Sequence, residues 1–301
     1  MLNIVSKQDP IQIQSLCLMI YGQPGIGKTS IGFTAENPLL LDFDQGAHRS
    51  RNRGDSVQIA EWKDVENMKA EDLEGYDTII VDTVGRLLDL LSVDIISKNP
   101  KMKGYGGALS LQGYGALKSS YATWLKVLLS YGKDVVLIAH EKEDKNGDEL
   151  IMRPDIQGGS GGEVFKRADG VAFMYKSGKQ TLLDFNPTEQ WQAKNAAGLL
   201  PLEVPNFTTK PDYLATVISD IKGSINALSA EQTEALAVVD KWRLGLHDVA
   251  DADGINKSIN DVQGLSGVVQ KQVKALIVSR ADELGLMFNK EEKLYEIKEV
   301  A

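Results

Sequence analysis

The sequence predicts an α/β fold with a mostly parallel, doubly wound sheet, and two observations point to it. Five short runs are continuously apolar, as expected for strands that are covered on both faces. Segments with helical periodicity, 84–97 and 116–130, lie between some of these runs, and such alternation is typical of βαβ units. The expected strands are LCLMIY (16–21), PLLLDF (38–43), TIIVD (78–82), DVVLIA (134–139) and GVAFMY (170–175).

The pattern changes after residue 175. We expect QTLLDF (180–185) and EQWQAK (189–194) to pair as a hairpin at the sheet edge. A proline-bearing linker, 198–211, then ends the α/β part. The predicted boundary therefore separates a core of residues 1–210 from a helical region of residues 211–301.

The C-terminal region is expected to contain only helices from about residue 224. Pro211 fits the first position of one helix, and SAEQ (229–232) fits a capping box before another. Residues 223–301 hold 9 basic and 13 acidic residues, a net charge of −4, and end in an acidic tail. The sequence leaves open whether these helices form only a packed bundle or also dock a partner protein.

Composition narrows the function classes. The 301-residue chain has a formal net charge of −9 and one cysteine, Cys17, inside an apolar run. One thiol cannot form an internal disulfide, so we expect a buried Cys17 and a soluble protein of the reducing cytoplasm. No run has membrane-spanning length, so no membrane partner is expected. The acidic balance argues against indiscriminate nucleic-acid binding but permits a local basic path.

A glycine-rich segment directly follows the first expected strand. GQPGIGKTS matches G-x-x-x-x-G-K-[ST] in the strand–loop–helix context that this motif needs. Its backbone N–H groups can surround phosphates, and the next helix adds a favourable dipole. We expect ATP and Mg²⁺ as cofactors, with Lys28 at the β- and γ-phosphates and the Thr29 hydroxyl on the metal. The expected nucleotide-binding residues are Gly22, Gln23, Pro24, Gly25, Ile26, Gly27, Lys28, Thr29 and Ser30.

Polar residues at the ends of other strands complete the expected site. Asp82 ends TIIVD and would present its carboxylate to the metal, with a helix cap as the alternative role. Asp44 is the preferred water-activating base over Asp42 and Gln45. His140 ends DVVLIAH, where it could sense the γ-phosphate; the alternative is a structural strand-end histidine.

These segments resemble the ATPase core of RecA-type recombinases, and most of all the compact phage nucleotide-binding proteins of the single-strand annealing type. The resemblance covers about residues 15–205. It places Asp44 where these recombinases carry a catalytic glutamate, and His140 where they carry a phosphate-sensing glutamine. QAKNAAGLLP resembles the segment whose lysine reaches the ATP of a neighbouring subunit, which makes Lys194 the candidate trans residue, although Ala196 stands where a second lysine is expected.

The resemblance also implies two DNA-binding loops. The first is expected at 98–115, in a stretch from Ile95 to Lys133 that has six lysines and no acid. Lysines can follow phosphates, and tyrosines can stack on bases; a flexible surface loop is the alternative. The second is expected at 141–162, followed by a segment that resembles the glycine-rich end of the recombinase loop. The expected DNA contacts are Lys98, Lys101, Lys103, Tyr105, Tyr114, Lys118, Arg153, Lys166 and Arg167.

The implied function is ATP-dependent binding of single-stranded DNA that promotes annealing or homologous recombination, in a phage-encoded protein of the host cytoplasm. Expected partners are single-stranded DNA, further copies of the chain in a ring or filament, and a single-strand-binding protein. ATP hydrolysis would be coupled to DNA binding. Two alternatives remain open: a RecA-fold helicase or loader motor, and a nucleotide-gated scaffold ATPase that binds a protein through its C-terminal helices.

Overall fold

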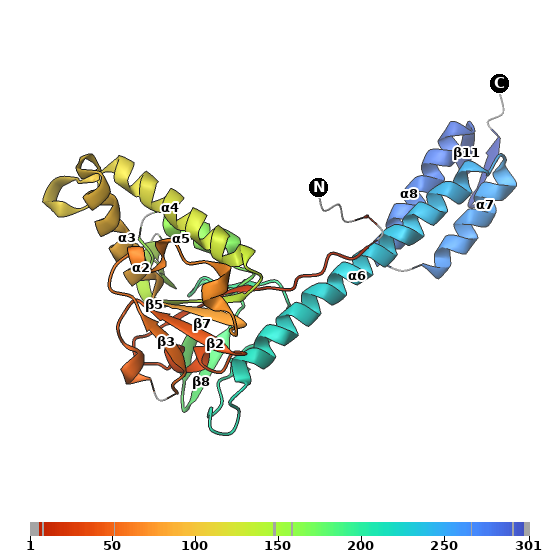
Figure 1. The fold of residues 1–301 in the computed structure, drawn as a ribbon. Coiled ribbons are helices and arrows are strands. Elements are labelled where there is room, and N and C mark those ends of the chain that lie inside the picture. The colour runs from red at the N-terminus through yellow and green to blue at the C-terminus, as the bar shows by residue number, and fades with distance from the viewer. Residues whose placement is uncertain are drawn as a thin grey trace. The chain divides into compact units, whose positions relative to one another are not determined.

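The computed structural model describes residues 6–7, 9–50, 52–146, 149–157, 159–265, 267–290 and 292–297. The chain divides into two compact units, residues 13–225 and residues 1–12 with 226–301 (Figure 1). The division falls later than the expected 210/211 boundary because helix α6 (Tyr213–His247) begins by packing on the sheet, where Leu214 and Ile221 are buried.

The larger unit is built on a sheet that has ten strands in the described part of the chain. Its order is β10-β8-β7-β1-β5-β4-β2-β3, with β6 paired to β5 and β9 to β7. Strand β1 runs parallel to β5 and β7, and β5 separates it from β4. The bounds are β1 (Cys17–Gly22), β2 (Pro38–Asp42), β3 (Asp55–Gln58), β4 (Thr78–Asp82), β5 (Asp134–Asn146), β6 (Glu149–Pro154), β7 (Gly170–Ser177), β8 (Gln180–Asp184), β9 (Lys194–Asn195) and β10 (Leu202–Glu203).

Alternate residues of β1 enter two different cores. Cys17 and Tyr21 pack on one face of the sheet, whereas Leu18 and Ile20 pack on the other. The whole strand is buried, which explains its continuous apolar sequence, and each large side chain contributes about 1.5–3 kcal/mol by burial. The predicted burial of Cys17 is confirmed.

Helices cover both faces of this sheet. One core receives side chains from α2, α3, α4 and α5, and the other from α1 and the first turns of α6. The predicted α/β class, with a mostly parallel sheet and a largely helical C-terminal region, is confirmed. The bounds are α1 (Lys28–Gly32), α2 (Lys63–Glu66), α3 (Val84–Lys98), α4 (Leu111–Ser130) and α5 (Ser160–Arg167), with 3-10 turns at Ala47–Arg49, Ala70–Leu73, Pro100–Met102 and Tyr105–Gly107.

The edge hairpin consists of other strands than predicted. β7 and β8 pair antiparallel, and β8 pairs with β10 on its other side, so the predicted pairing of 180–185 with 189–194 is wrong. The turn signal Asn-Pro-Thr is followed by a segment in which Trp191 packs its ring 5.4 Å from that of Phe173. The backbone of this segment also bonds to Met152 of β6, through Gln190 and Gln192, and these contacts place it beside β6 rather than beside β8.

Both predicted DNA-binding loops contain regular structure. The first is the connection of a helical hairpin, in which α4 begins at Leu111 rather than at residue 116 and the end of the hairpin projects away from the sheet (Figure 1). Glycines disfavour helices, but Gly113 fits here because a Cβ atom would lie 2.7 Å from the Met102 carbonyl oxygen. The second loop is largely the antiparallel hairpin of β5 and β6.

The smaller unit has a core of its own, formed by α6, α7 (Ala252–Asp261) and α8 (Gly267–Glu283). Its sequence predictions need three corrections. Helix α6 is continuous through residues 229–232, so SAEQ does not cap a new helix. The first residue of α6 is Tyr213, so Pro211 precedes the helix and does not occupy its first position. Strands β11 (Leu286–Asn289) and β12 (Leu294–Ile297) form a hairpin where only helices were predicted. Among the described residues, no helix combines the length and the apolar character needed to cross a bilayer.

The close approach of β1 and β7 gives a testable prediction. A Cβ atom on Gly22 would lie 2.2 Å from the Met174 carbonyl oxygen, so Gly22→Ala must push the strands apart and should destabilise the fold by about 1–3 kcal/mol. Gly162→Ala is the matched control, because it adds a methyl group in open space within α5 and should be neutral or stabilising by up to about 1 kcal/mol. Urea unfolding followed by tryptophan fluorescence measures both; equal midpoints would contradict the packing argument.

Candidate functional site

The glycine-rich segment forms a turn between β1 and α1. Gly25 and Gly27 have positive φ angles of 76° and 113°, which glycine adopts without strain. Helix α1 has only five residues, so the expected helix dipole is small and the backbone N–H groups of the turn carry most of the anion-binding capacity. Ser30 is directed elsewhere, since its hydroxyl shares a 2.8 Å hydrogen bond with that of Ser50.

Lys28 is buried beneath this turn. Its ammonium donates hydrogen bonds to the carbonyl oxygens of Gly22 (2.8 Å) and Gln23 (2.7 Å), and only 4% of the residue is exposed. Burial lowers the pKa of Lys28 to about 8, and the nearby Asp82 carboxylate opposes that shift. A buried cation at the base of a turn of N–H donors is suited to bind the phosphates of a nucleotide.

Thr29 and Asp82 lie in direct contact. The Thr29 hydroxyl donates to the Asp82 carboxylate at 2.5 Å, although the two residues come from α1 and the end of β4. Burial raises the pKa of Asp82 to about 6, while the Thr29 hydrogen bond and Lys28 lower it. A hydroxyl and a carboxylate oxygen are the donors that Mg²⁺ prefers, and a desolvated carboxylate gains from a cation. The pair therefore fits the expected ion, which would neutralise phosphate charge when bound.

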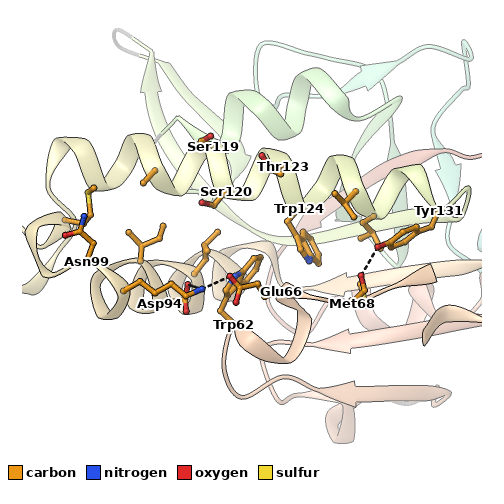
Figure 2. A pocket seen from close by; sticks show the side chains of 17 residues that line it. Trp62, Glu66, Met68, Asp94, Asn99, Ser119, Ser120, Thr123, Trp124 and Tyr131 are labelled. Carbon is orange, nitrogen blue, oxygen red and sulfur yellow. Dashed lines mark hydrogen bonds and ion pairs between the residues drawn. The ribbon is translucent and has the colours of Figure 1, made fainter. Parts of the chain in front are cut away.

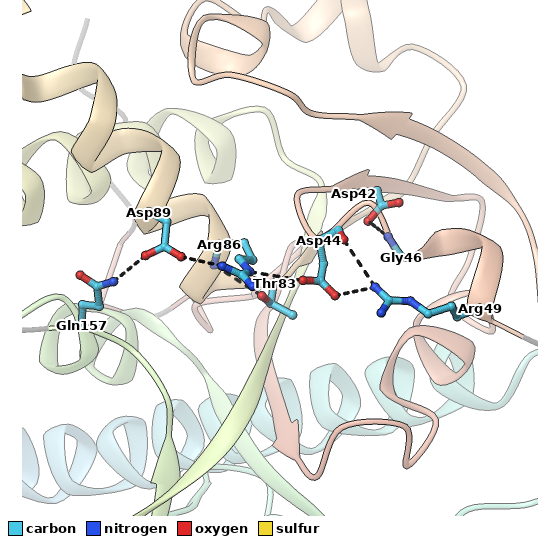
Figure 3. Close-up of polar contacts among 8 residues, drawn as sticks. All are labelled: Asp42, Asp44, Gly46, Arg49, Thr83, Arg86, Asp89 and Gln157. Carbon is cyan, nitrogen blue, oxygen red and sulfur yellow. Dashed lines mark hydrogen bonds and ion pairs between the residues drawn. The ribbon is translucent and has the colours of Figure 1, made fainter. Parts of the chain in front are cut away.

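The two acids at the end of β2 and just after it have different roles. Asp42 accepts hydrogen bonds from the backbone N–H groups of Gly46 and Ala47, both at 2.9 Å, so it shapes the turn. Asp44 instead lies between two guanidinium groups, with Arg49 at 2.9 Å and Arg86 at 3.4 Å; Figure 3 shows both contacts. The arginine partners were missed from the sequence because neither belongs to a motif.

Two residues of β5 lie beside the turn. His140 is paired in register with Gly22 and lies within β5, which continues to Asn146, rather than at its end. Burial and the positive charge of Lys28 lower the pKa of His140, which favours neutral imidazole, and its Nδ1 has no hydrogen-bond partner among the described residues. Glu141 was missed: its carboxylate bonds to Gln23, and burial raises its pKa while Lys28 opposes.

Lys194 does not lie near the nucleotide site of its own chain. It pairs in register with Val171, near the start of β7, whereas Gly22 pairs with Met174 farther along. Its ammonium donates to the Ala168 carbonyl oxygen at 2.5 Å. The expected contact of Lys194 concerned a neighbouring subunit, so it stays a prediction.

The expected DNA contacts fall into two groups. Lys98, Lys118, Arg153 and Lys166 form ion pairs with acids of the same chain, and Arg167 has a buried Nε. Lys101 and Lys103 have no ion-pair partner among the described residues, and they flank the end of the α3–α4 hairpin with Tyr105, which is fully exposed. Tyr114 is partly exposed on α4.

A cavity of about 500 Å³ lies between α2, α3 and α4, and its lining extends along the α3–α4 hairpin as far as Met102. Figure 2 shows Trp62 and Trp124 in its middle, between Asn99 at one end and Tyr131 at the other, and the hydroxyl residues Ser119, Ser120 and Thr123 along α4. At its rim, Lys98 binds Glu66 at 2.5 Å and Asp94 at 2.9 Å. Lys98 is therefore part of the cavity wall and is less available to phosphates than the lysines at the hairpin end.

Comparisons with known proteins give one curated relative and several solved structures. The SPbeta prophage-derived uncharacterized protein YorG of Bacillus subtilis (strain 168) is 22% identical over 307 residues, covering 96% of this chain and 84% of that protein. An ATPase of the type III secretion system of pathogenic bacteria is 14% identical with a TM-score of 0.35; the match covers 54% of this chain and about half, 51%, of that one. The KaiC-like protein PH0186 of Pyrococcus horikoshii OT3 is 9% identical with a TM-score of 0.32, covering 58% and 86% of the two chains.

The raised pKa of Asp82 predicts how stability depends on pH. The folded chain keeps this proton up to about pH 6, whereas the unfolded chain releases it near 3.8. Stability from this group is therefore fully present below pH 3.8 and is lost as the pH rises through 6. In metal-free buffer, the free energy of unfolding of Asp82→Asn should rise relative to that of the wild type as the pH increases from 3.8 to about 6, by at most about 3 kcal/mol. Urea unfolding at both ends of the window measures this; an unchanged difference would contradict it.

The arrangement of the turn, Lys28, Thr29 and Asp82 is that of a nucleotide-binding ATPase site. A family model described as an AAA domain (AAA_24) matches residues 14–197. This range contains the turn, both acids at the strand ends and His140, and it covers more than half of the chain. The chain belongs to this family of AAA-domain proteins.

Proposed function

We propose that this protein is an ATPase that binds single-stranded DNA in an ATP-dependent manner and promotes strand annealing. The observation that carries the proposal is the end of the α3–α4 hairpin, where two unpaired lysines among the described residues stand beside a fully exposed tyrosine. Cations that follow phosphates, combined with an aromatic face on which a base can stack, are the features that bind single strands without sequence preference.

The proposal assigns fewer residues to DNA contacts than the sequence predicted. Lys118 and Lys166 both lie beside the acid Glu163, at 3.1 and 3.6 Å, whereas Lys101 and Lys103 have no ion-pair partner among the described residues. We therefore assign the strand chiefly to Lys101, Lys103 and Tyr105. The exposed Leu111, at the start of α4, adds an apolar contact next to them.

The nucleotide site would act as the switch. Lys28 would bind the β- and γ-phosphates, Thr29 and Asp82 would hold Mg²⁺, and Asp44 would orient the attacking water. Lys194 of one copy would contact the nucleotide of the next copy in a ring or filament. Relatedness to a prophage protein supports a phage-encoded protein that acts in the host cytoplasm, where a single-strand-binding protein is a further expected partner.

Variants at the hairpin end test the DNA contact. Replacing Lys101 and Lys103 by Ala should weaken binding of a single-stranded oligonucleotide and reduce the salt slope by about 1.4, since each phosphate contact contributes about 0.7. Tyr105→Ala should cost about 1–3 kcal/mol of binding free energy through lost stacking. Fluorescence anisotropy over a salt series measures both.

Lys166→Ala is the matched control for these variants. It removes an exposed lysine of the same unit that lies on α5 and not at the end of the α3–α4 hairpin, so affinity and salt slope should stay close to those of the wild type. Equal losses of DNA affinity in the control and in the hairpin variants would show that DNA is attracted to the general positive charge of the surface and not to a specific site. Lys28→Ala should abolish ATP hydrolysis in all backgrounds.

A second candidate function is a nucleotide-gated scaffold that binds a protein. It is favoured by the β11–β12 hairpin, where Met287, Phe288, Leu294 and Ile297 are all 45–77% exposed, beside an apolar cavity of about 200 Å³. Truncation is a poor test because α6 runs through the boundary between the units. Phe288→Asp is better: lost partner binding with intact DNA binding would favour the scaffold, and the annealing proposal expects no dependence of DNA binding on Phe288.

A further inference from the structure

A continuous polar chain leads from Asp44 to the segment that precedes α5. Arg86 donates from Nε to Asp44 Oδ1 at 3.4 Å and from Nη1 to Asp89 Oδ2 at 3.2 Å. The other oxygen of Asp89 accepts a hydrogen bond from Gln157 Nε2 at 2.6 Å. Figure 3 shows these four side chains in sequence, and we call them the Arg86 chain.

The four residues come from separate parts of the fold. Asp44 follows β2, Arg86 and Asp89 lie in the first turns of α3 directly after the strand that ends in Asp82, and Gln157 lies between β6 and α5. The Arg86 chain thus joins the candidate base to the segment that was predicted as the second DNA-binding loop. No sequence motif links these positions.

Asp44 has one guanidinium on each oxygen. Arg49 occupies Oδ2 at 2.9 Å, and Arg86 occupies Oδ1. A carboxylate oxygen that accepts from a guanidinium is a poorer acceptor for the proton of a water molecule. Each Asp44 oxygen therefore shares its negative charge with one arginine, and it becomes a stronger acceptor when that arginine moves away.

Arg86 is the arginine that can be displaced. Both arginine side chains are 61% exposed, but Arg86 is shared between two carboxylates and its contact with Asp44 is the longer one. Exposed ion pairs contribute little to stability and exchange readily. The position of Asp89, which Gln157 holds, thus decides which carboxylate the guanidinium favours.

The α3–α4 hairpin is in contact with this segment. Lys118 of α4 binds Glu163 of α5 at 3.1 Å, and a Cβ atom on Gly159 would lie 3.4 Å from the Lys118 side chain. A shift of α4 would therefore act on the segment that carries Gln157. This contact gives the end of the hairpin a physical route to the nucleotide site.

We propose that Arg86 is a positioning residue that couples this segment to ATP hydrolysis. With Gln157 bound to Asp89, Arg86 occupies Asp44 and turnover is slow. Displacement of Gln157 leaves Asp89 free to attract Arg86, and Oδ1 of Asp44 becomes available to orient water. The inference rests on the proposed function, because it takes Asp44 as the base.

Steady-state ATP hydrolysis without DNA tests the coupling in the full chain. Gln157→Leu and Arg86→Gln should each raise kcat at least about twofold with little change in KM, the weak end of couplings between contacting residues. The double variant should equal Arg86→Gln alone, because Gln157 acts through Arg86. Arg86→Lys should restore part of the restraint. Arg53→Gln is the control, since Arg53 donates to the His48 carbonyl oxygen on the same face.

Multiplicative effects in the double variant, or reduced kcat in either single variant, would overturn the proposal. Lys28→Ala and Asp44→Asn separate this result from the proposed function: full activity in both would remove the assigned site and base. Amide hydrogen exchange then measures the coupling independently of ATP hydrolysis. Gln157→Leu should increase exchange in peptides around Asp44, which Gln157 does not contact, and unchanged exchange there would contradict the coupling.

Discussion

The packing of β1 between two parallel neighbours is the constraint on which the site depends. β1 is buried on both faces and pairs along its length with β5 and β7. This pairing places Gly22 against the Met174 backbone, where only a glycine fits, and directs the chain into the turn above Lys28. Because parallel strands end at the same edge, Asp42, Asp82 and His140 reach that edge together.

Charge at this edge is arranged around a buried cation and buried acids. Lys28 and Asp82 are both desolvated, with their pKa values moved toward neutrality to about 8 and about 6. Such groups gain most when phosphates and a metal ion supply opposite charge, because a low-dielectric site strengthens those interactions. Glu141 belongs to the same group of charges, because its partly buried carboxylate interacts with the Lys28 ammonium.

Sequence patterns located the elements that carry the candidate site and missed what depends on tertiary contacts. The glycine-rich turn lies between a strand and a helix, and Asp82 ends a strand, as predicted. Arg86 and Gln157 are 71 residues apart and meet only through Asp89, so no local pattern reveals them. Helix α4 was predicted too short because Gly113 has low helix propensity, while the contact that favours it, with Met102, is tertiary.

The central claim is that the nucleotide site controls DNA binding at the α3–α4 hairpin. The most direct measurement is the affinity of the wild-type protein for a labelled single-stranded oligonucleotide with and without ATP and Mg²⁺, over a salt series. The account predicts binding that ATP tightens and salt weakens. No binding in either state, or equal affinity with and without ATP, would contradict it.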